Sequence, residues 1–474
     1  MRALILFILL LSVSCANPPY SGIDAPSSSK PATDSELITY IDQRLEDEYY
    51  WLDEVNQKRS LFNRRLPWDE YLPNALSKLT TNEDDGYYNS NGQRGYYSYI
   101  RELSSTTRAE VKGLGIVLHY TILIMDRENN RYGFIIDAVY PDSPAAIAGL
   151  KRGDVITMID GKYLDNSNHV AMFNGIVLNT ISSMNIEYLR RSEGDEPYTA
   201  TIDEGFYYEN PVVYSEVIEP SGYDKKIGYL VYNGFESEYD EELLAVLTEF
   251  ASEGVGELIL DLRCNGGGAV NSAIKLCSAI VPNSYEGELL CVAKRNKKNS
   301  KMPESSEFRL EHTGQLLNLN RLTVICSENS ASASELVIMG LRGLDFPVRL
   351  IGQTTEGKNC GMDVTRKRIK GKEYEYAPIT FMCFNAKGFG DWGEGIVPDV
   401  DLTVDNEFGV SDDYYPLPYS DWGDAHYDIA LAVALADITG SGISQSTRSA
   451  TSSDIAIATT LERPSVGIRL YGEE

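Results

Sequence analysis

The sequence predicts a multidomain protein of the mixed α/β class. Its 474 residues are enough for two or three domains. From residue 206 to 437, apolar strand-type runs alternate with amphipathic helical segments, as in a sheet covered by helices. Residues 107–205 alternate short β-type runs with turn residues, and residues 37–106 show a helical repeat of apolar side chains. These patterns predict a small helical N-terminal domain, a β-rich domain and a larger α/β core.

The composition limits the classes of function. The chain carries a formal charge of −28 at pH 7, and 43% of its residues are hydrophobic. We expect no nucleic-acid partner, because phosphate binding requires a basic face. The seven cysteines include no CxxC pair, so the sequence indicates no zinc or other metal site. Most lie in apolar runs and are expected to be buried free thiols, although their spacing leaves pairing open.

The first fifteen residues are typical of an export signal. Arg2 is followed by an apolar run, Ala3 to Val13, that is too short to span a bilayer. The small residues before Cys15 resemble a bacterial lipoprotein signal, although Ser12 stands where that pattern has leucine. An ordinary secretory signal is the alternative. The resemblance implies a signal peptide over residues 1–15, lipidation at Cys15, and a protein lipid-anchored to the cell envelope, at the outer membrane. The residues after Cys15 lack an acidic run of the kind associated with surface display, which favours the periplasmic side.

The next two segments form a tether and a helical domain in this prediction. Residues 16–36 are rich in Pro, Ser and Asp, which favours a flexible linker. From residue 37 to 106, apolar side chains recur at helical spacing. The repeat is clearest at its start, where the four positions are Leu37, Ile41, Leu45 and Tyr49.

Residues 107–205 carry a compact set of β-domain signals. In SPAAIAGL, Ser143 can cap a short helix, Pro144 suits its first position and Gly149 can end it. GDVITMIDGK then predicts a strand, a turn and a strand. This ordered set resembles a PDZ domain of the circularly permuted bacterial kind. The resemblance implies that a peptide carboxylate binds to the loop formed by Gly113, Leu114, Gly115 and Ile116.

Residues 206–437 are predicted to form one α/β domain. The runs KKIGYLVYNGF, VGELILDLRC, RLTVIC and PVRLIG are apolar enough for buried strands. Between the first two lies an amphipathic helix with Leu243, Leu247 and Phe250 on one face. The Ser/Thr-rich segment 438–474 has little to bury, although its last apolar stretch could add a terminal strand.

The stretch ENSASASELVIMG, residues 328–340, follows one predicted strand and opens a predicted helix. A serine hydroxyl needs a nearby base and donors for the developing oxyanion before it is a useful nucleophile. A turn of small residues at a helix start can present one side chain and aim backbone N–H groups at a substrate. Close helix packing would use the same small residues, so this turn alone leaves both interpretations open.

Three further segments favour the catalytic interpretation. DLRCNGGG, residues 261–268, follows a buried strand and offers glycine N–H groups. TEGKNCGM places Lys358 in a glycine-flanked loop, and DWGEGIVPDV closes the domain. In this order, after a PDZ-like segment, the motifs resemble the C-terminal processing (tail-specific) serine peptidase family. The helical N-terminus, tether and lipoprotein signal resemble its Bacteroidetes-type branch.

The resemblance implies a fold and a set of site residues. The peptidase core of that family is a crotonase-like superhelix of β-β-α units with a further sheet beside it. The nucleophile would be Ser332, with Ser330 and Ser334 as competitors, and the base would be Lys358. The oxyanion donors would be the backbone N–H groups of Ala333 and Gly267, with Gly266 or Gly268 as alternatives to Gly267.

One position departs from the family pattern. A lysine acts as a base only when it is uncharged, and burial in an apolar pocket favours that form. The family places a glutamine after the lysine to orient the amine, but Met362 stands at that position here, and a thioether is a weak acceptor. Either another polar group such as Asn359 positions the lysine, or the activity is low.

The implied function is that of an exported serine endopeptidase that uses a Ser-Lys dyad. Its PDZ domain would bind the C-terminal segments of protein or peptide substrates, or gate the site. No organic cofactor is implied. Two alternatives stay open: an inactive peptide-binding scaffold, which Met362 favours, and a small apolar ligand-binding protein on the same fold.

Overall fold

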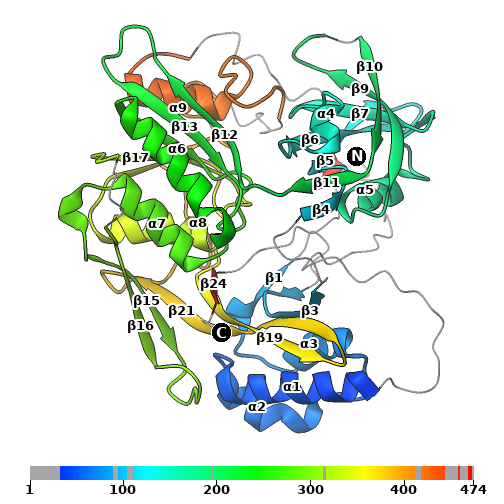
Figure 1. Cartoon of the computed structure of the whole chain (residues 1–474), viewed down its shortest axis with the longest axis vertical. Coiled ribbons are helices and arrows are strands. Elements are labelled where there is room, and N and C mark those ends of the chain that lie inside the picture. The colour runs from blue at the N-terminus through cyan, green and yellow to red at the C-terminus, as the bar shows by residue number, and fades with distance from the viewer. Residues whose placement is uncertain are drawn as a thin grey trace, which may run out of the picture.

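The computed structural model describes residues 32–88, 94–103, 110–194, 196–312, 317–410, 418–443, 457–458 and 468–471. The predicted signal peptide, its Cys15 and most of the predicted tether lie outside these ranges. The helices within these ranges include none with the length and apolar character that a membrane span requires. Figure 1 shows an α/β core, a β-rich domain beside it, and a third part that contains the N-terminal helices.

The N-terminal segment is helical only in its first half. Its four repeating side chains, Leu37 to Tyr49, are fully buried, which confirms the predicted helical face. Strands then replace the helix that was predicted up to residue 106. The first two of these strands pair with each other, and the third pairs with a strand far along the chain, a contact with no local signature. The elements are α1 (Ala32–Glu48), α2 (Leu52–Lys58), α3 (Trp68–Leu76), β1 (Gly86–Tyr88), β2 (Arg94–Tyr96) and β3 (Tyr99–Leu103).

The N-terminal helices share their core with a sheet from the second half of the chain. In that sheet the strand order is β16-β15-β21-β19-β20-β3. Tyr49, directly after α1, and Tyr71 on α3 pack in one cluster with Met362, Tyr376 and Ile379. The N-terminal part is therefore completed by β15 (Leu289–Arg295), β16 (Ser305–Arg309), β19 (Cys360–Ile369), β20 (Lys372–Ala377) and β21 (Ile379–Asn385).

The β-rich domain contains the short capped helix that the sequence predicted. Ser143 Oγ accepts a hydrogen bond from the N–H of Ala146 at 3.2 Å, and Pro144 opens the short helix. The main sheet has the order β10-β9-β7-β6-β5, and β11 pairs with β4. The elements are β4 (Glu110–Gly113), β5 (Ile116–Asp126), β6 (Arg131–Val139), α4 (Pro144–Ile147), β7 (Asp154–Ile159), β8 (Lys162–Tyr163), α5 (His169–Val177), β9 (Ser183–Arg190), β10 (Pro197–Asp203) and β11 (Gly205–Tyr208).

The core is a sheet of order β12-β13-β14-β17-β18-β22 with helices on both faces (Figure 1). Neighbours along β14 alternate between the faces: Leu258 and Leu260 join the cluster under α6, α7 and α8, and Ile259 joins the cluster under α9. The mixed α/β class is thus confirmed. The elements are β12 (Val212–Ile218), β13 (Lys226–Tyr232), α6 (Asp240–Ser252), β14 (Val255–Asp261), α7 (Val270–Ile280), β17 (Leu322–Cys326), α8 (Ala333–Gly343), β18 (Val348–Gly352), β22 (Val400–Asp401) and α9 (Ile429–Thr439).

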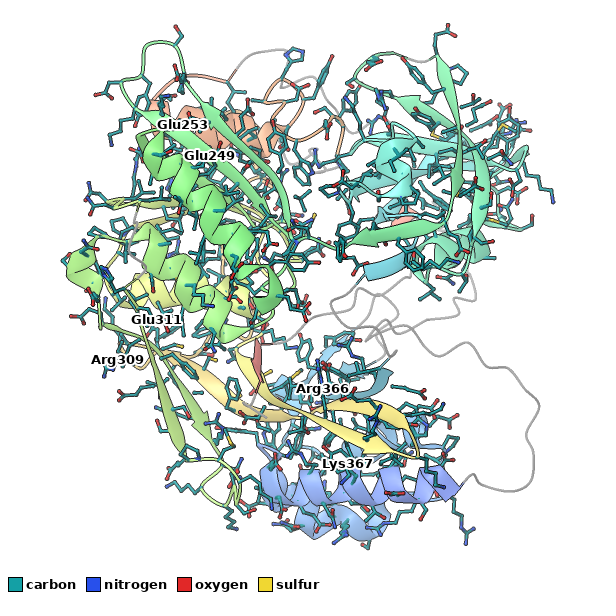
Figure 2. All side chains as sticks on the ribbon, in the orientation of Figure 1. Glu249, Glu253, Arg309, Glu311, Arg366 and Lys367 are labelled. Carbon is teal, nitrogen blue, oxygen red and sulfur yellow. The ribbon has the colours of Figure 1, made fainter. Side chains whose placement is uncertain are left out.

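Charged side chains line the outer surface of these layers. Four of the exposed charged residues are labelled in Figure 2: Glu249 on α6, Glu253 directly after that helix, and Arg366 and Lys367 on β19. On α6 the exposed charges alternate with buried apolar residues, which is the amphipathic pattern that predicted this helix.

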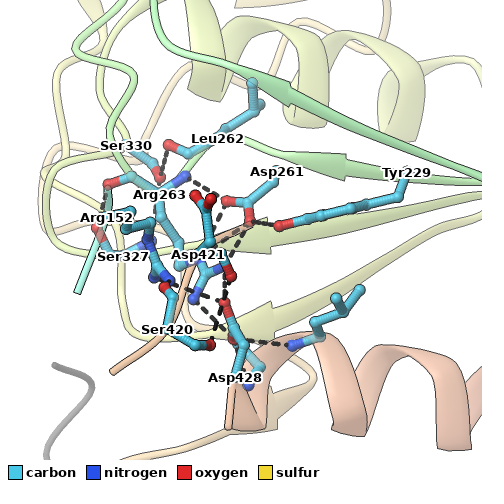
Figure 3. Close-up of polar contacts among 12 residues, drawn as sticks. Arg152, Tyr229, Asp261, Leu262, Arg263, Ser327, Ser330, Ser420, Asp421 and Asp428 are labelled. Carbon is cyan, nitrogen blue, oxygen red and sulfur yellow. Dashed lines mark hydrogen bonds and ion pairs between the residues drawn. The ribbon is translucent and has the colours of Figure 1, made fainter. Parts of the chain in front are cut away.

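A network of buried ions joins the β-rich domain to the core (Figure 3). Arg152, which follows α4, donates to the carbonyl oxygen of Ser420 at 2.8 Å and lies 3.5 Å from the Asp428 carboxylate. Arg263 at the end of β14 bonds both Asp261 and Asp428. The guanidinium of Arg152 also lies 4.0 Å from the ring centroid of Trp422. The start of α9 is therefore held between the two domains.

Candidate active site

The turn between β17 and α8 holds Ser332 in an unusual backbone conformation. Its φ is 63° and its ψ is −109°, whereas α8 begins at the next residue, Ala333. Positive φ is uncommon for a residue with a Cβ and is found mainly where the surrounding structure imposes it, often at functional sites. The Ser332 Oγ is shielded from solvent.

The two flanking serines hold the turn in place. Ser330 Oγ donates to the carbonyl oxygen of Leu262 at 2.8 Å, and Ser334 Oγ donates to that of Asn265 at 2.9 Å. Both bonds tie the turn to the segment 261–268. Ser330 and Ser334 therefore hold the turn against that segment through their hydroxyl groups. Ser332, between them, is the serine whose side chain is not used in these two bonds.

Glu335 connects this turn to the loop that carries Lys358. One carboxylate oxygen accepts the N–H groups of Ser332 at 2.7 Å and Lys358 at 2.8 Å. The other accepts the Thr355 hydroxyl at 2.6 Å and the N–H of Gly357 at 2.8 Å. Burial raises the pKa of Glu335 to about 7, although these four donors favour its charged form. Sequence reasoning missed this residue, although the spacing S-x-x-E at a helix start is a recognised signal.

Lys358 is buried against an aromatic ring of the N-terminal segment. Its side chain is 1% exposed, and its Nζ lies 3.8 Å from the ring centroid of Tyr97. The Tyr97 hydroxyl donates to Glu356 at 2.9 Å, which fixes the ring next to the lysine loop. A ring face attracts an ammonium group and also excludes water.

A buried carboxylate lies in the same region. Asp85, which precedes β1, accepts hydrogen bonds from the Tyr49 hydroxyl at 2.6 Å and from the Ser98 hydroxyl and N–H at 2.7 and 2.8 Å. Burial raises the pKa of Asp85 to about 6, while these bonds and the nearby charge of Lys358 oppose that rise. No sequence signal pointed to Asp85 or Tyr97, because both come from a segment more than 250 positions before the lysine.

The position that departs from the family pattern is part of the core. Met362 is fully buried and packs with Tyr97 and Tyr376 among the N-terminal side chains. Asn359, the polar group considered as a substitute, donates its side-chain N–H to the carbonyl oxygen of Gly390 at 2.8 Å. The groups near the Lys358 amine include the ring of Tyr97, which lies against it, and the carboxylate of Asp85, whose pKa its charge lowers.

The two expected oxyanion donors are placed differently. Ala333 is the first residue of α8, where a backbone N–H has no acceptor within the helix. The N–H of Gly267 donates to the side-chain oxygen of Asn265 at 2.9 Å. An oxyanion role for Gly267 would require that bond to break, so Gly266 and Gly268 remain the alternatives.

The other expected residues lie apart from this site. Gly113, Leu114, Gly115 and Ile116 form the link between β4 and β5 in the β-rich domain. There the carbonyl oxygens of Leu114 and Gly115 accept the N–H groups of Ala145 and Tyr140.

The six described cysteines are free thiols, and burial raises the pKa of Cys264 to about 12, which disfavours a thiolate nucleophile.

Comparison with known proteins agrees with this arrangement. Residues 226–402 match the model of peptidase family S41, and residues 135–173 match that of the PDZ domain. A probable CtpA-like serine protease of Staphylococcus aureus (strain N315) is 24% identical over 282 residues, which cover 59% of this chain and 51% of that protein. A protein of the same description from Staphylococcus epidermidis is 25% identical and covers 71% of this chain and 63% of its own.

The fold is also found among solved structures. A putative S41 protease from Bacteroides fragilis NCTC 9343 superimposes with a TM-score of 0.66 at 22% identity, over 88% of this chain and 99% of that one. The present chain spans about half the length of the first curated relatives that it matches.

The fold and the site together define a protein in which a PDZ domain is joined to an α/β core with a buried serine and a buried lysine. Residues 226–402 are similar to peptidase family S41, which agrees with the family that the sequence motifs indicated.

Proposed function

We propose that the protein is a serine endopeptidase of the C-terminal processing type. Ser332 is the nucleophile and Lys358 is the general base. The observation that carries this proposal is that Glu335 binds the backbone N–H groups of both residues while Ser332 is held at a positive φ. This arrangement fixes the relative position of a strained serine and a buried amine.

The chemistry follows from the chemical nature of these groups. The uncharged Lys358 amine takes the proton of the Ser332 hydroxyl as the oxygen attacks the peptide carbonyl. The N–H of Ala333 stabilises the oxyanion, and the lysine then gives its proton to the departing amine. Water hydrolyses the acyl-enzyme by the same steps. Tyr97 and Asp85 orient the amine, in place of the glutamine that Met362 replaces.

The proposal is tested by cleavage of unfolded casein. We expect Ser332→Ala and Lys358→Ala each to reduce kcat by at least about 10³-fold, because the two residues act as a unit. A fluorophosphonate probe should label the wild-type protein and not Ser332→Ala. Equal cleavage rates in the three proteins would refute the assignment.

A second candidate is a peptide-binding scaffold with little or no peptidase activity. The contact between Lys358 and the Tyr97 ring favours it, because an aromatic face stabilises the charged ammonium rather than the uncharged base. Peptide binding without fluorophosphonate labelling would support the scaffold, and labelling of Ser332 would exclude it.

The cellular setting extends this proposal. The PDZ domain would bind the C-terminal segments of substrates or gate the site, as expected from its loop at residues 113–116. The chain would be exported and anchored through Cys15. Growth with radiolabelled palmitate, comparing the natural chain with Cys15→Ala, tests the anchor: loss of label in the variant is the expected result, and equal labelling would refute it.

A further inference from the structure

The last described residues of the chain lie on the strand that follows Lys358. β24 (Ile468–Tyr471) pairs in parallel with β19, with Ile468 opposite Gly361 and Tyr471 opposite Val364. The other edge of β19 pairs with β21 in this region. β24 therefore pairs with the edge of β19 that β21 does not occupy. It also contacts α7, and Figure 1 shows it between α8 and β19, where the core meets the N-terminal part.

A second piece of the same segment binds to the PDZ domain. β23 (Ile457–Ala458) pairs antiparallel with β5, with Ile457 opposite Ile122 and Ala458 opposite Thr121. β5 is the strand that follows the expected peptide-binding loop. The C-terminal segment thus adds a short strand to each of two sheets.

Both contacts recognise the backbone of an extended peptide. Strand addition draws its affinity from main-chain hydrogen bonds, so it accepts many sequences. A peptidase that holds its substrate as a strand needs such an edge close to its base. The part of β19 from Gly361 to Val364 begins shortly after Lys358 and is already occupied by a strand from the same chain.

We propose that this edge of β19 is the binding site for an extended peptide beside Lys358, and that the C-terminal segment of the chain itself is its resident occupant. Any effect of the tail on catalysis rests on the proposed peptidase function, whereas the binding of the tail to β19 does not depend on that function. A segment tethered through α9 acts at an effective concentration on the order of millimolar. A substrate peptide must displace it and would add parallel to β19.

The test uses the full-length chain with the double substitution Arg469→Pro and Leu470→Pro. Adjacent residues of a strand point their N–H groups to opposite sides, so either residue 469 or residue 470 has its N–H towards β19. Proline has no N–H, so the double substitution removes that hydrogen bond whichever of the two residues makes it. We expect amide hydrogen exchange in residues 361–364 to become about tenfold faster or more. A fluorescent peptide of residues 462–474 should bind the Arg469/Leu470 variant about tenfold more tightly than it binds the chain with the natural tail, when both proteins also carry Ser332→Ala.

The control carries Ser452→Pro and Ser453→Pro, outside both paired segments, and should behave as the parent chain. Adding the free peptide should restore slow exchange in the Arg469/Leu470 variant, which rules out misfolding as the cause. Unchanged exchange in residues 361–364 would overturn the proposal.

The fluorophosphonate probe separates this proposal from the proposed function. Faster labelling of Ser332 in the Arg469/Leu470 variant than in the parent supports occlusion of the site by the tail. Equal labelling rates despite faster exchange overturn occlusion. If neither protein is labelled, the peptidase proposal fails, and the exchange measurement still decides where the tail binds.

Discussion

Ser332 and Lys358 are brought together by a single side chain. The Glu335 carboxylate accepts N–H groups from the serine turn and from the lysine loop, and its remaining oxygen accepts Thr355 and Gly357. A carboxylate with four donors fixes direction more tightly than any one contact could. The position of the Ser332 turn relative to the Lys358 loop therefore depends on Glu335.

At the same scale, the Tyr97 ring should control the pH at which activity appears. In Tyr97→Leu the attraction of the ring for the ammonium is lost, so the uncharged amine is present at lower pH. The acidic limb of the kcat/KM profile should move to lower pH by roughly half to one unit. The measurement is casein or peptide cleavage as a function of pH.

The matched control for this prediction is Tyr97→Phe. It keeps the ring over Lys358 and removes only the hydrogen bond to Glu356. Its acidic limb should coincide with that of the wild type. A shift of the same size in both variants would show that the hydroxyl, and not the ring, sets the profile.

At the scale of elements, the loop from β18 to β19 can form only with glycine before the lysine. Gly357 has a φ of 95°, and a Cβ there would lie 2.3 Å from the carbonyl oxygen of Gly393. The obstacle is backbone, which cannot move aside as a flexible side chain can. The loop that presents Lys358 thus depends on close contact with the segment that contains Gly393.

Gly357→Ala should therefore lower both stability and activity. We expect a loss of about 2 to 4 kcal/mol in the free energy of unfolding, measured by urea denaturation, together with a strong loss of kcat. The control is Gly371→Ala, which also has a positive φ, 86°, but has nothing within 4 Å of the added Cβ. That variant should lose only about 1 kcal/mol and keep its activity, because it bears the backbone strain alone.

At the scale of the whole molecule, buried ions connect the PDZ domain to the core. Burial would raise the pKa of Asp428, but the charges of Arg263 and Arg152 outweigh it and lower that pKa to about 2. The ionised carboxylate is thus favoured in the folded protein. Its contribution to stability is complete above the unfolded pKa of about 4 and is lost as the pH falls towards 2.

Asp428→Asn should consequently destabilise the protein by about 2 to 3 kcal/mol near pH 7, and the difference from wild type should shrink between about pH 4 and pH 2. Asparagine can still accept the N–H groups of Ala430 and Leu431 that cap α9, so the change isolates the charge. The measurement is chemical denaturation at each pH. Asp421→Asn, at an exposed ion pair of 3.9 Å with Lys151, should change stability by less than about 1 kcal/mol; a comparable loss there would contradict the explanation.

The sequence predicted what local chemistry determines. The Ser143 cap, the helical face of Leu37 to Tyr49 and the strand–turn–helix around Ser332 all have short-range signals, and the structure contains each of them. The surroundings of the Lys358 amine could not be predicted, because Tyr97 and Asp85 reach it through contacts between distant segments, such as the pairing of β3 with β20. Contacts between such distant segments depend on tertiary packing, which leaves no periodicity in either segment.

The pairing of β3 with β20 also bears on how the chain is made. Tyr99 lies opposite Ala377, so β3 cannot pair with β20 until the ribosome has added the 278 positions from 99 to 377 (377 − 99 = 278). At ordinary elongation rates of about 5–20 residues per second, that delay is on the order of tens of seconds. Throughout it, the apolar faces of α1 and α3 lack their partner and are open to aggregation, so we expect the nascent protein to need a holding chaperone.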